Sequence, residues 1–128
     1  MYPPIFAVCA GSATVQTLLS DGNGRIRLYP FGEAPQDDPK AYAVWQIITG
    51  APENSLSCVP DLDQYSVQVD VYARTADEAR AAAKALRDAI EQDFERGGYV
   101  VAWNGESRDP ATRAYRISFS SDWYSSRA

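Results

Sequence analysis

The feature that most restricts the fold is an alternating segment that leads directly into a helical one, within residues 63–94. From position 65, apolar and polar side chains alternate without a break: Tyr65, Val67, Val69, Val71 and Ala73 on one side, and Ser66, Gln68, Asp70, Tyr72 and Arg74 on the other. Successive side chains of a strand point to opposite faces, so this pattern predicts a half-buried antiparallel strand.

Thr75 is predicted to cap the helix that follows. Residues 75–78 fit a capping box, in which the Thr75 hydroxyl accepts from the Glu78 amide and the Glu78 carboxylate accepts from the Thr75 amide. Beyond the cap, apolar residues recur at helical spacing, at Ala79, Ala82, Ala83, Leu86, Ile90 and Phe94. Gly97 and Gly98 are expected to end the helix by supplying a left-handed turn.

The rest of the chain supplies one helical region and four more strands. Residues 5–19 are helical, either as one helix interrupted at Gly11-Ser12 or as two short helices. Strands are expected over 25–29 at a sheet edge, 42–49, 99–104 and 113–124, with loops over 30–41, 50–62 and 105–112 and a frayed tail over 125–128. The order α-β-β-β-α-β-β predicts a single α+β domain over residues 1–128, an antiparallel sheet with helices packed on one face.

The net charge of the chain indicates which classes of partner it can bind. The 128 residues carry a net charge of −5 and a sequence pI of about 4.6, which argues against nucleic-acid binding because that depends on clustered Lys and Arg. The apolar run at 5–10 is too short to cross a bilayer and follows no basic residue, so we expect neither signal peptide nor membrane anchor. Cys9 in that run and Cys58 in a loop are expected to be free thiols of a cytosolic protein.

The chain has no histidine, which excludes catalytic triads of the Ser-His-Asp and Cys-His kinds and zinc sites that contain histidine. Paired carboxylates leave one enzymatic alternative, a hydrolase using Asp61 with Asp63 or Glu106 with Asp109. The flanking turn residues favour solvated carboxylates instead, as they do for Asp37-Asp38. No stretch has the oxygen spacing of an EF-hand. We therefore expect no catalytic residue, cofactor or metal.

Aromatic residues stand on most of the expected strands, at Tyr42, Trp45, Tyr65, Trp103, Tyr115, Phe119 and Trp123. Most are expected to lie in the core. One helix layer cannot cover both faces of the sheet, however, and the strand at 42–49 is nearly apolar on both faces. Its leftover apolar surface is predicted to be an oligomer interface, where Tyr and Trp are favoured. A small-ligand binding module, which would instead be a monomer with a closed apolar pocket, is the other non-enzymatic alternative.

The chain resembles the tail-completion, or tail-terminator, proteins of long-tailed bacteriophages. Six segments carry the resemblance in order: Met1-Tyr2-Pro3-Pro4-Ile5-Phe6, Arg27-Leu28-Tyr29-Pro30-Phe31-Gly32-Glu33-Ala34-Pro35-Gln36, Tyr42-Ala43-Val44-Trp45-Gln46, Pro52-Glu53-Asn54, Val67-Gln68-Val69-Asp70-Val71, and Trp103-Asn104-Gly105-Glu106-Ser107-Arg108-Asp109-Pro110. Residues 91–98 form a longer segment than the family pattern has.

The resemblance implies a non-enzymatic α+β protein of the virion, assembled in the host cytoplasm, that forms a typically hexameric ring. The ring would cap the head-proximal end of the tail tube, end tail growth, and bind the tail-tube protein and a head-neck connector. DNA would pass through it without specific binding. A head-side stopper protein is the alternative within the same assembly. Interface residues are expected within the resembling segments, at Phe31, Glu33, Trp45, Glu53, Asn54, Asp70, Asn104, Glu106, Arg108 and Asp109.

Overall fold

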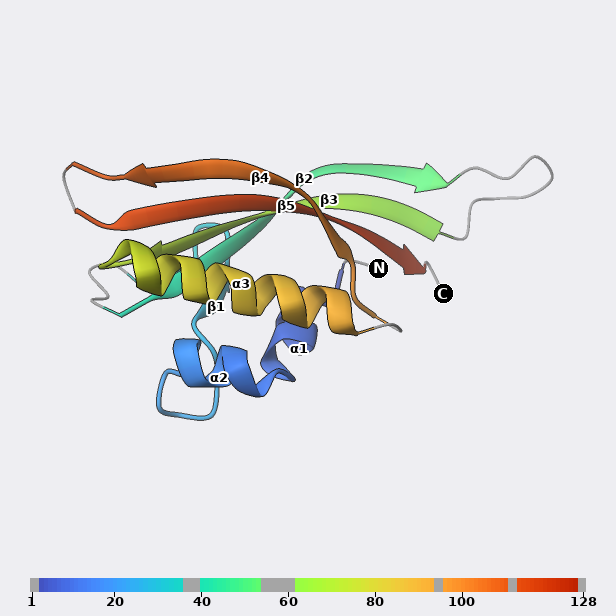
Figure 1. Ribbon diagram of the computed structural model, residues 1–128. Helices are drawn as coiled ribbons and strands as arrows, with labels where there is room; N and C mark the ends of the chain where they lie inside the picture. The colour runs from blue at the N-terminus through green and yellow to red at the C-terminus, as the bar shows by residue number, and fades with distance from the viewer. Residues whose placement is uncertain (1–2, 36–39, 54–61, 94–95, 111–112, 127–128) are drawn as a thin grey trace.

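The computed structural model describes residues 3–35, 40–53, 62–93, 96–110 and 113–126. Within these ranges the chain forms three helices and one five-stranded sheet, which confirms the α+β class (Figure 1). The elements are α1 (Ile5–Ala10), α2 (Ala13–Leu19), β1 (Leu28–Pro30), β2 (Tyr42–Glu53), β3 (Leu62–Ala73), α3 (Ala76–Gln92), β4 (Tyr99–Arg108) and β5 (Tyr115–Ser126). The helical region is thus two short helices, separated at Gly11 and Ser12.

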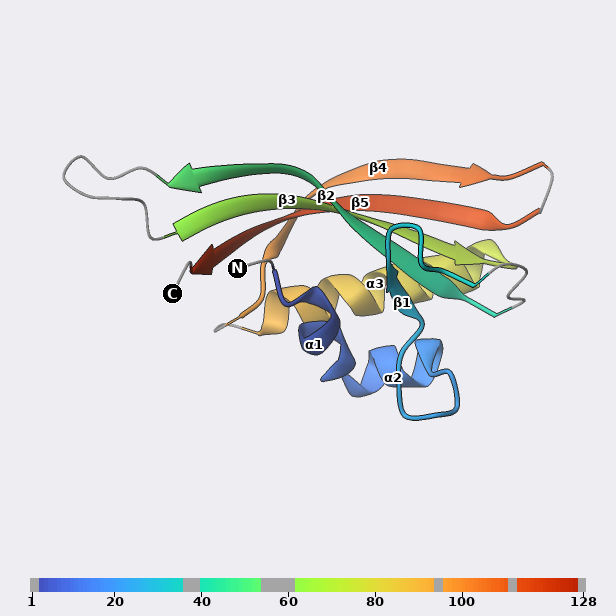
Figure 2. The same cartoon turned by 180° about the vertical axis from the view of Figure 1, so that it is seen from behind.

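The sheet has the strand order β1-β2-β3-β5-β4 and all three helices on one of its faces (Figures 1 and 2). The predicted antiparallel pairing is correct for β2, β3, β5 and β4, and the first strand is an edge strand as expected. The prediction of antiparallel pairing is wrong for β1, which pairs parallel to β2 with Leu28 opposite Ala43. The connection over residues 31–41 is long enough to carry the chain back to the end where β1 began, as parallel pairing requires.

The core lies between the sheet and α3. Val67, Val69, Val71 and Ala73 of β3 are buried, and α3 buries the expected stripe at Ala79, Ala82, Ala83, Leu86 and Ile90. Phe94 lies outside the described residues. The Thr75 hydroxyl accepts from the Glu78 amide at 3.1 Å, which confirms Thr75 as the helix cap, whereas the described residues show no reciprocal bond from the Thr75 amide to the Glu78 carboxylate. Helices α1 and α2 pack on the other side of α3 and bury Val8, Val15 and Leu19 (Figure 2).

Gly97 and Gly98 do not form the left-handed turn that the sequence predicted. Helix α3 ends at Gln92, and the glycines with positive φ are Gly22, Gly24, Gly32 and Gly105. A Cβ on Gly97 would lie 2.0 Å from the carbonyl oxygen of Ile90, and one on Gly98 would lie 2.4 Å from that of Asp122. These glycines are therefore required by close backbone approach as the chain passes from α3 into β4.

Two long hairpin arms replace much of the predicted loops. Strand β2 continues to Glu53, opposite Leu62, and β4 continues to Arg108, opposite Tyr115. The tail was expected to fray from residue 125, but β5 reaches Ser126. Cross-strand hydrogen bonds outweigh the polar composition of these segments, because strand propensity depends strongly on the partner strand. Of the predicted loop 50–62, residues 54–61 lie outside the described part, and the first strand begins three residues later than expected, at Leu28.

Cys9 is a fully buried free thiol in α1, in agreement with the sequence analysis. Burial raises its pKa to about 12, so the thiol is protonated at neutral pH. Cys58 lies outside the described residues.

Candidate functional site

The residues expected at interfaces lie mostly at two opposite edges of the sheet. Phe31 and Glu33 directly follow β1, and Trp45 stands beside them on β2, where its carbonyl accepts from the Phe31 amide at 2.9 Å. Asn104, Glu106 and Arg108 belong to β4 at the far edge, and Asp109 follows it. Asp70 stands on β3 in the middle. Glu53 is the last residue of β2, and Asn54 lies outside the described residues.

The edge formed by β1 presents one strongly exposed aromatic ring. Phe31 is 70% exposed, whereas Trp45 is half-buried and packs against the core. Trp45 also lines a cavity of about 230 Å³ together with Phe6 and Ile26. Its buried Nε1 has no hydrogen-bond partner among the described residues. Trp45 is thus in part a core residue. The helices cover one face of its strand, and the oligomer interface expected on its remaining apolar surface stays a prediction.

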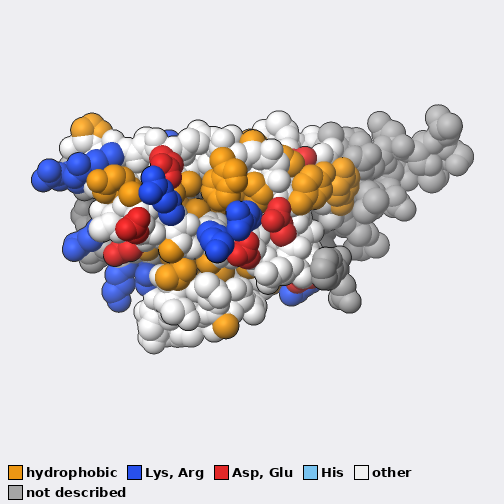
Figure 3. Space-filling model, in the orientation of Figure 1, with side chains coloured by type: hydrophobic (Ala, Val, Ile, Leu, Met, Phe, Trp, Pro, Cys, Tyr) orange, Lys and Arg blue, Asp and Glu red, His pale blue; other side chains and the backbone are white. Residues whose placement is uncertain are grey.

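The edge formed by β4 is longer and richer in exposed apolar groups. Tyr99, Val101 and Trp103 are each nearly half exposed, at 45 to 49%. Figure 3 shows apolar side chains gathered along this edge. The Trp103 ring packs against Phe119 with ring centroids 5.2 Å apart. An edge strand with unpaired backbone groups and apolar side chains is a template for pairing with another chain.

Trp103 belongs to the set of aromatic residues of which most are expected in the core, and neither Tyr99 nor Val101 is among the expected interface residues. Spacing of apolar residues at 99, 101 and 103 was visible in the sequence. Strand order was the missing information, because only an edge strand leaves such a pattern uncovered.

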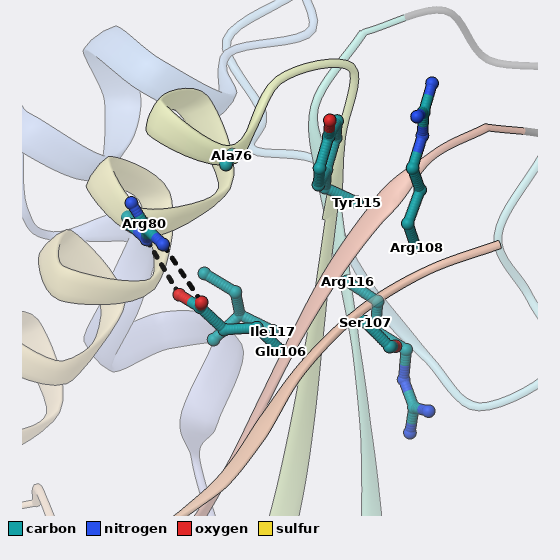
Figure 4. Close-up of a pocket in the computed structure, with 8 residues that line it drawn as sticks. All are labelled: Ala76, Arg80, Glu106, Ser107, Arg108, Tyr115, Arg116 and Ile117. Atoms are coloured by element: carbon teal, nitrogen blue, oxygen red, sulfur yellow. Dashed lines mark hydrogen bonds and ion pairs between the residues drawn. The ribbon is translucent and has the colours of Figure 1, made fainter.

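A groove between α3 and β4 is bridged by an ion pair (Figure 4). Arg80 donates from Nε to Oε1 of Glu106 at 2.7 Å and from Nη2 to Oε2 at 3.0 Å. This bidentate pair lowers the pKa of the Glu106 carboxyl. A general acid needs a raised pKa, so the geometry disfavours Glu106 as one in the hydrolase alternative. Asp61 of the other proposed pair lies outside the described residues.

Removing the guanidinium in the Arg80→Ala variant should raise the titration midpoint of Glu106. The wild-type pair stabilises the ionised carboxylate, so its contribution to folding is present at neutral pH and is lost as the pH falls through the folded-state pKa. Carbon-13 NMR of the Glu106 carboxyl measures the midpoint. The Arg87→Ala variant removes the same charge from α3, where Arg87 pairs with Asp88, and should leave it unchanged. Equal midpoints in wild type and Arg80→Ala would contradict the assignment.

Asp70 stands on the sheet face opposite the helices and is only 8% exposed. It accepts hydrogen bonds from Arg116 at 3.0 Å and from Gln68 at 3.1 Å. Ser66, Ser118 and Ser120 share this face with Gln68, so the surface is polar with little net charge. Asp70 is thus held in a network within the sheet.

Within the described ranges, no group of three or more Cys, Asp or Glu side chains could hold a metal ion. None of the helices in those ranges is both long and apolar enough to cross a membrane.

The family model of "Tail completion protein gp17" matches residues 3–126. The chain belongs to this tail-completion family. The resemblance seen in the sequence is therefore confirmed over nearly the whole chain. A chain from the solved structure titled "Virion of native gene transfer agent (GTA) particle" has a similar fold, with a TM-score of 0.64 at 14% identity, covering 94% of this chain and 90% of that one. No match was found among curated proteins.

Proposed function

We propose that this chain is a single-domain, non-enzymatic assembly protein whose copies form a ring at the head-proximal end of a phage tail tube. The ring ends tail growth and joins the tail to the head. Membership of the tail-completion family supports the tail role. The observation that carries the ring is the presence of two unlike open edges on opposite sides of one sheet.

Both edges offer backbone groups for pairing. Within the described residues no strand pairs with the outer side of β4, where the Val100 amide donates to the Glu91 carboxylate at 3.0 Å, and β1 pairs with β2 only through residues 43–45. The outer side of β2 from Gln46 to Glu53 therefore extends beyond β1. Two different surfaces that bind each other generate a head-to-tail contact, which closes into a ring when the rotation between subunits allows it. We propose six subunits, following the family resemblance.

The open face of the sheet suits a passage for DNA. Its serine and glutamine side chains offer no basic stripe, and the chain as a whole is acidic. Phosphates are not attracted to such a surface, so DNA can slide past it. The remaining partners in this proposal are the tail-tube protein below the ring and a neck connector above it, within the virion after assembly in the host cytoplasm.

A phage that lacks this chain should produce filled heads that are not joined to tails, together with tails of abnormal length. Electron microscopy of lysates measures both, and a plasmid copy of the wild-type chain should restore normal particles. Normal virions without the chain would refute the proposal. Cross-linking distinguishes the tail-side from the head-side position, because only a tail-side ring contacts the tail-tube protein directly.

A further inference from the structure

A cavity of about 410 Å³ lies where α2, the beginning of α3 and the start of β2 meet. It is lined by Thr17, Leu18, Arg27, Lys40, Ala41, Arg74, Glu78 and Ala82. Three of these residues are cations, although the chain as a whole has a net charge of −5. Figure 3 shows basic side chains gathered at this end of the molecule, on the left. We call this cavity the basic pocket.

Arg27 forms the inner wall of the basic pocket and is only 6% exposed. Its Nε donates to the carbonyl of Ala41 at 2.6 Å, and its Nη1 donates to the carbonyl of Ser20. These bonds fix the guanidinium between α2 and β2. Among the described residues no carboxylate forms an ion pair with Arg27. A buried charge without a counterion favours the arrival of an anion.

Arg74 adds a second cation at the mouth of the pocket. It is exposed, directly follows β3, and forms no ion pair within the described part of the chain. Arginine presents a planar fork of donors that matches a carboxylate in a bidentate manner. Glu78 lines the same pocket and places one negative charge beside the cations.

The two ends of the sheet differ in charge. Arg74, Arg108 and Arg113 lie at the end where β3 and β4 finish. Carboxylates gather at the other end, with Asp63 and Asp122 on β3 and β5 and with Glu91 and Asp93 where α3 finishes; Arg96 pairs with Asp93 there. The first end also carries Asp77, Glu78 and Asp109, so the two ends differ in the balance of charges and neither carries one sign alone.

We propose that the basic pocket binds a carboxylate side chain from an acidic segment of a partner protein in the phage assembly. This inference rests on the proposed function, because that function makes the partner a component of the phage assembly. The binding chemistry follows from the residues of the basic pocket alone. A protein carboxylate fits better than DNA, because the pocket is a small concavity with a carboxylate beside it, whereas DNA binding uses an extended basic surface.

The test uses the full-length, nitrogen-15-labelled chain and an end-blocked hexaglutamate peptide at low salt. We expect the peptide to shift the backbone amides of Thr17, Ala41 and Ala82 and the Nε–H of Arg27. The Arg74→Gln variant should weaken this binding about fivefold, the scale expected for one lost charge contact. Lys84→Gln removes an exposed positive charge that does not line the pocket and should leave the affinity within about twofold.

The Glu78→Gln variant should change the affinity for hexaglutamate in the opposite direction. Removing the carboxylate beside the pocket should strengthen hexaglutamate binding several-fold, which a purely structural role of these residues does not explain. Absence of shifts at the pocket, or equal weakening by Arg74→Gln and Lys84→Gln, would overturn the proposal. Tighter binding of a short DNA duplex at the same amides would replace the protein partner with nucleic acid.

The chain's own Asp37 and Asp38 precede Lys40 and lie outside the described residues. If they occupied the pocket, a variant with both changed to Asn would bind hexaglutamate far more tightly than wild type, and the assignment to a partner would be wrong. Equal affinity supports the partner. An Arg74→Gln variant that forms normal rings but binds hexaglutamate about fivefold more weakly supports this inference independently of the proposed ring. Loss of ring formation with intact peptide binding would contradict only the proposed ring.

Discussion

Replacing Gly97 with alanine should lower the free energy of unfolding by about 3 kcal/mol, the upper part of the range for overpacked positions. The added Cβ would lie 2.0 Å from the carbonyl oxygen of Ile90 and 2.6 Å from that of Asp93. Both are backbone atoms, so no side chain can rotate away. The chain can accept the methyl group only by displacing the end of α3, whose Ile90 is fully buried.

Urea unfolding followed by circular dichroism measures the effect. Gly11→Ala is the matched control, because its Cβ would come no closer than 3.5 Å to any atom and its φ of −74° suits alanine. We expect that control to be neutral or slightly stabilising, by less than about 1 kcal/mol. Gly97→Asn separates the two explanations of this glycine, since asparagine tolerates a left-handed conformation but not a crowded one. A stable Gly97→Asn variant would favour the left-handed turn that the sequence predicted.

Local chemistry explains which parts of the fold could be predicted. The alternation at 65–73 and the cap at Thr75 depend only on residues that are neighbours in the sequence, and both are present in the structure. The parallel pairing of β1 depends on where an eleven-residue connection returns the chain, which composition does not specify. The lengths of the hairpin arms depend on partner strands. Glycine is needed at position 97 because the carbonyl oxygens of Ile90 and Asp93 lie close to it. That closeness depends on how the chain turns back after α3, which the local sequence does not specify.

The assembly surfaces were predicted in part. Segments shared with the family contain residues at both edges of the sheet, such as Phe31 and Arg108, but no local pattern places them on opposite sides. Trp45 was favoured over Trp103 because its strand is apolar on both faces, yet Trp103 stands on the edge strand. The basic pocket unites α2, α3 and the starts of β1 and β2, and no local pattern brings Arg27 and Arg74 together.

Two variants that each block one edge should complement one another if the ring is head-to-tail. Trp103→Glu places a charge on the β4 edge, and Phe31→Glu places one beside β1. Each side chain is a large, exposed aromatic group, and loss of such a group at the centre of an interface reduces affinity by on the order of thirtyfold. Each variant alone should therefore remain monomeric under conditions where the wild type assembles, with or without tail-tube protein.

Mixing the two variants should produce a dimer with one copy of each, because the Trp103→Glu copy retains the β1 edge and the Phe31→Glu copy retains the β4 edge. Native mass spectrometry with one isotope-labelled variant identifies this species. Ala81→Glu adds the same charge at an exposed position of α3 and should leave wild-type assembly unchanged, while circular dichroism verifies each fold. A two-fold contact through β4 alone predicts the contrary result, in which Phe31→Glu dimerises with itself and mixing adds no new species. Formation of the mixed dimer therefore tests whether the contact is head-to-tail as well as which residues form it. When a different surface is blocked in each copy, only a contact between two unlike surfaces leaves one intact pair that can still bind.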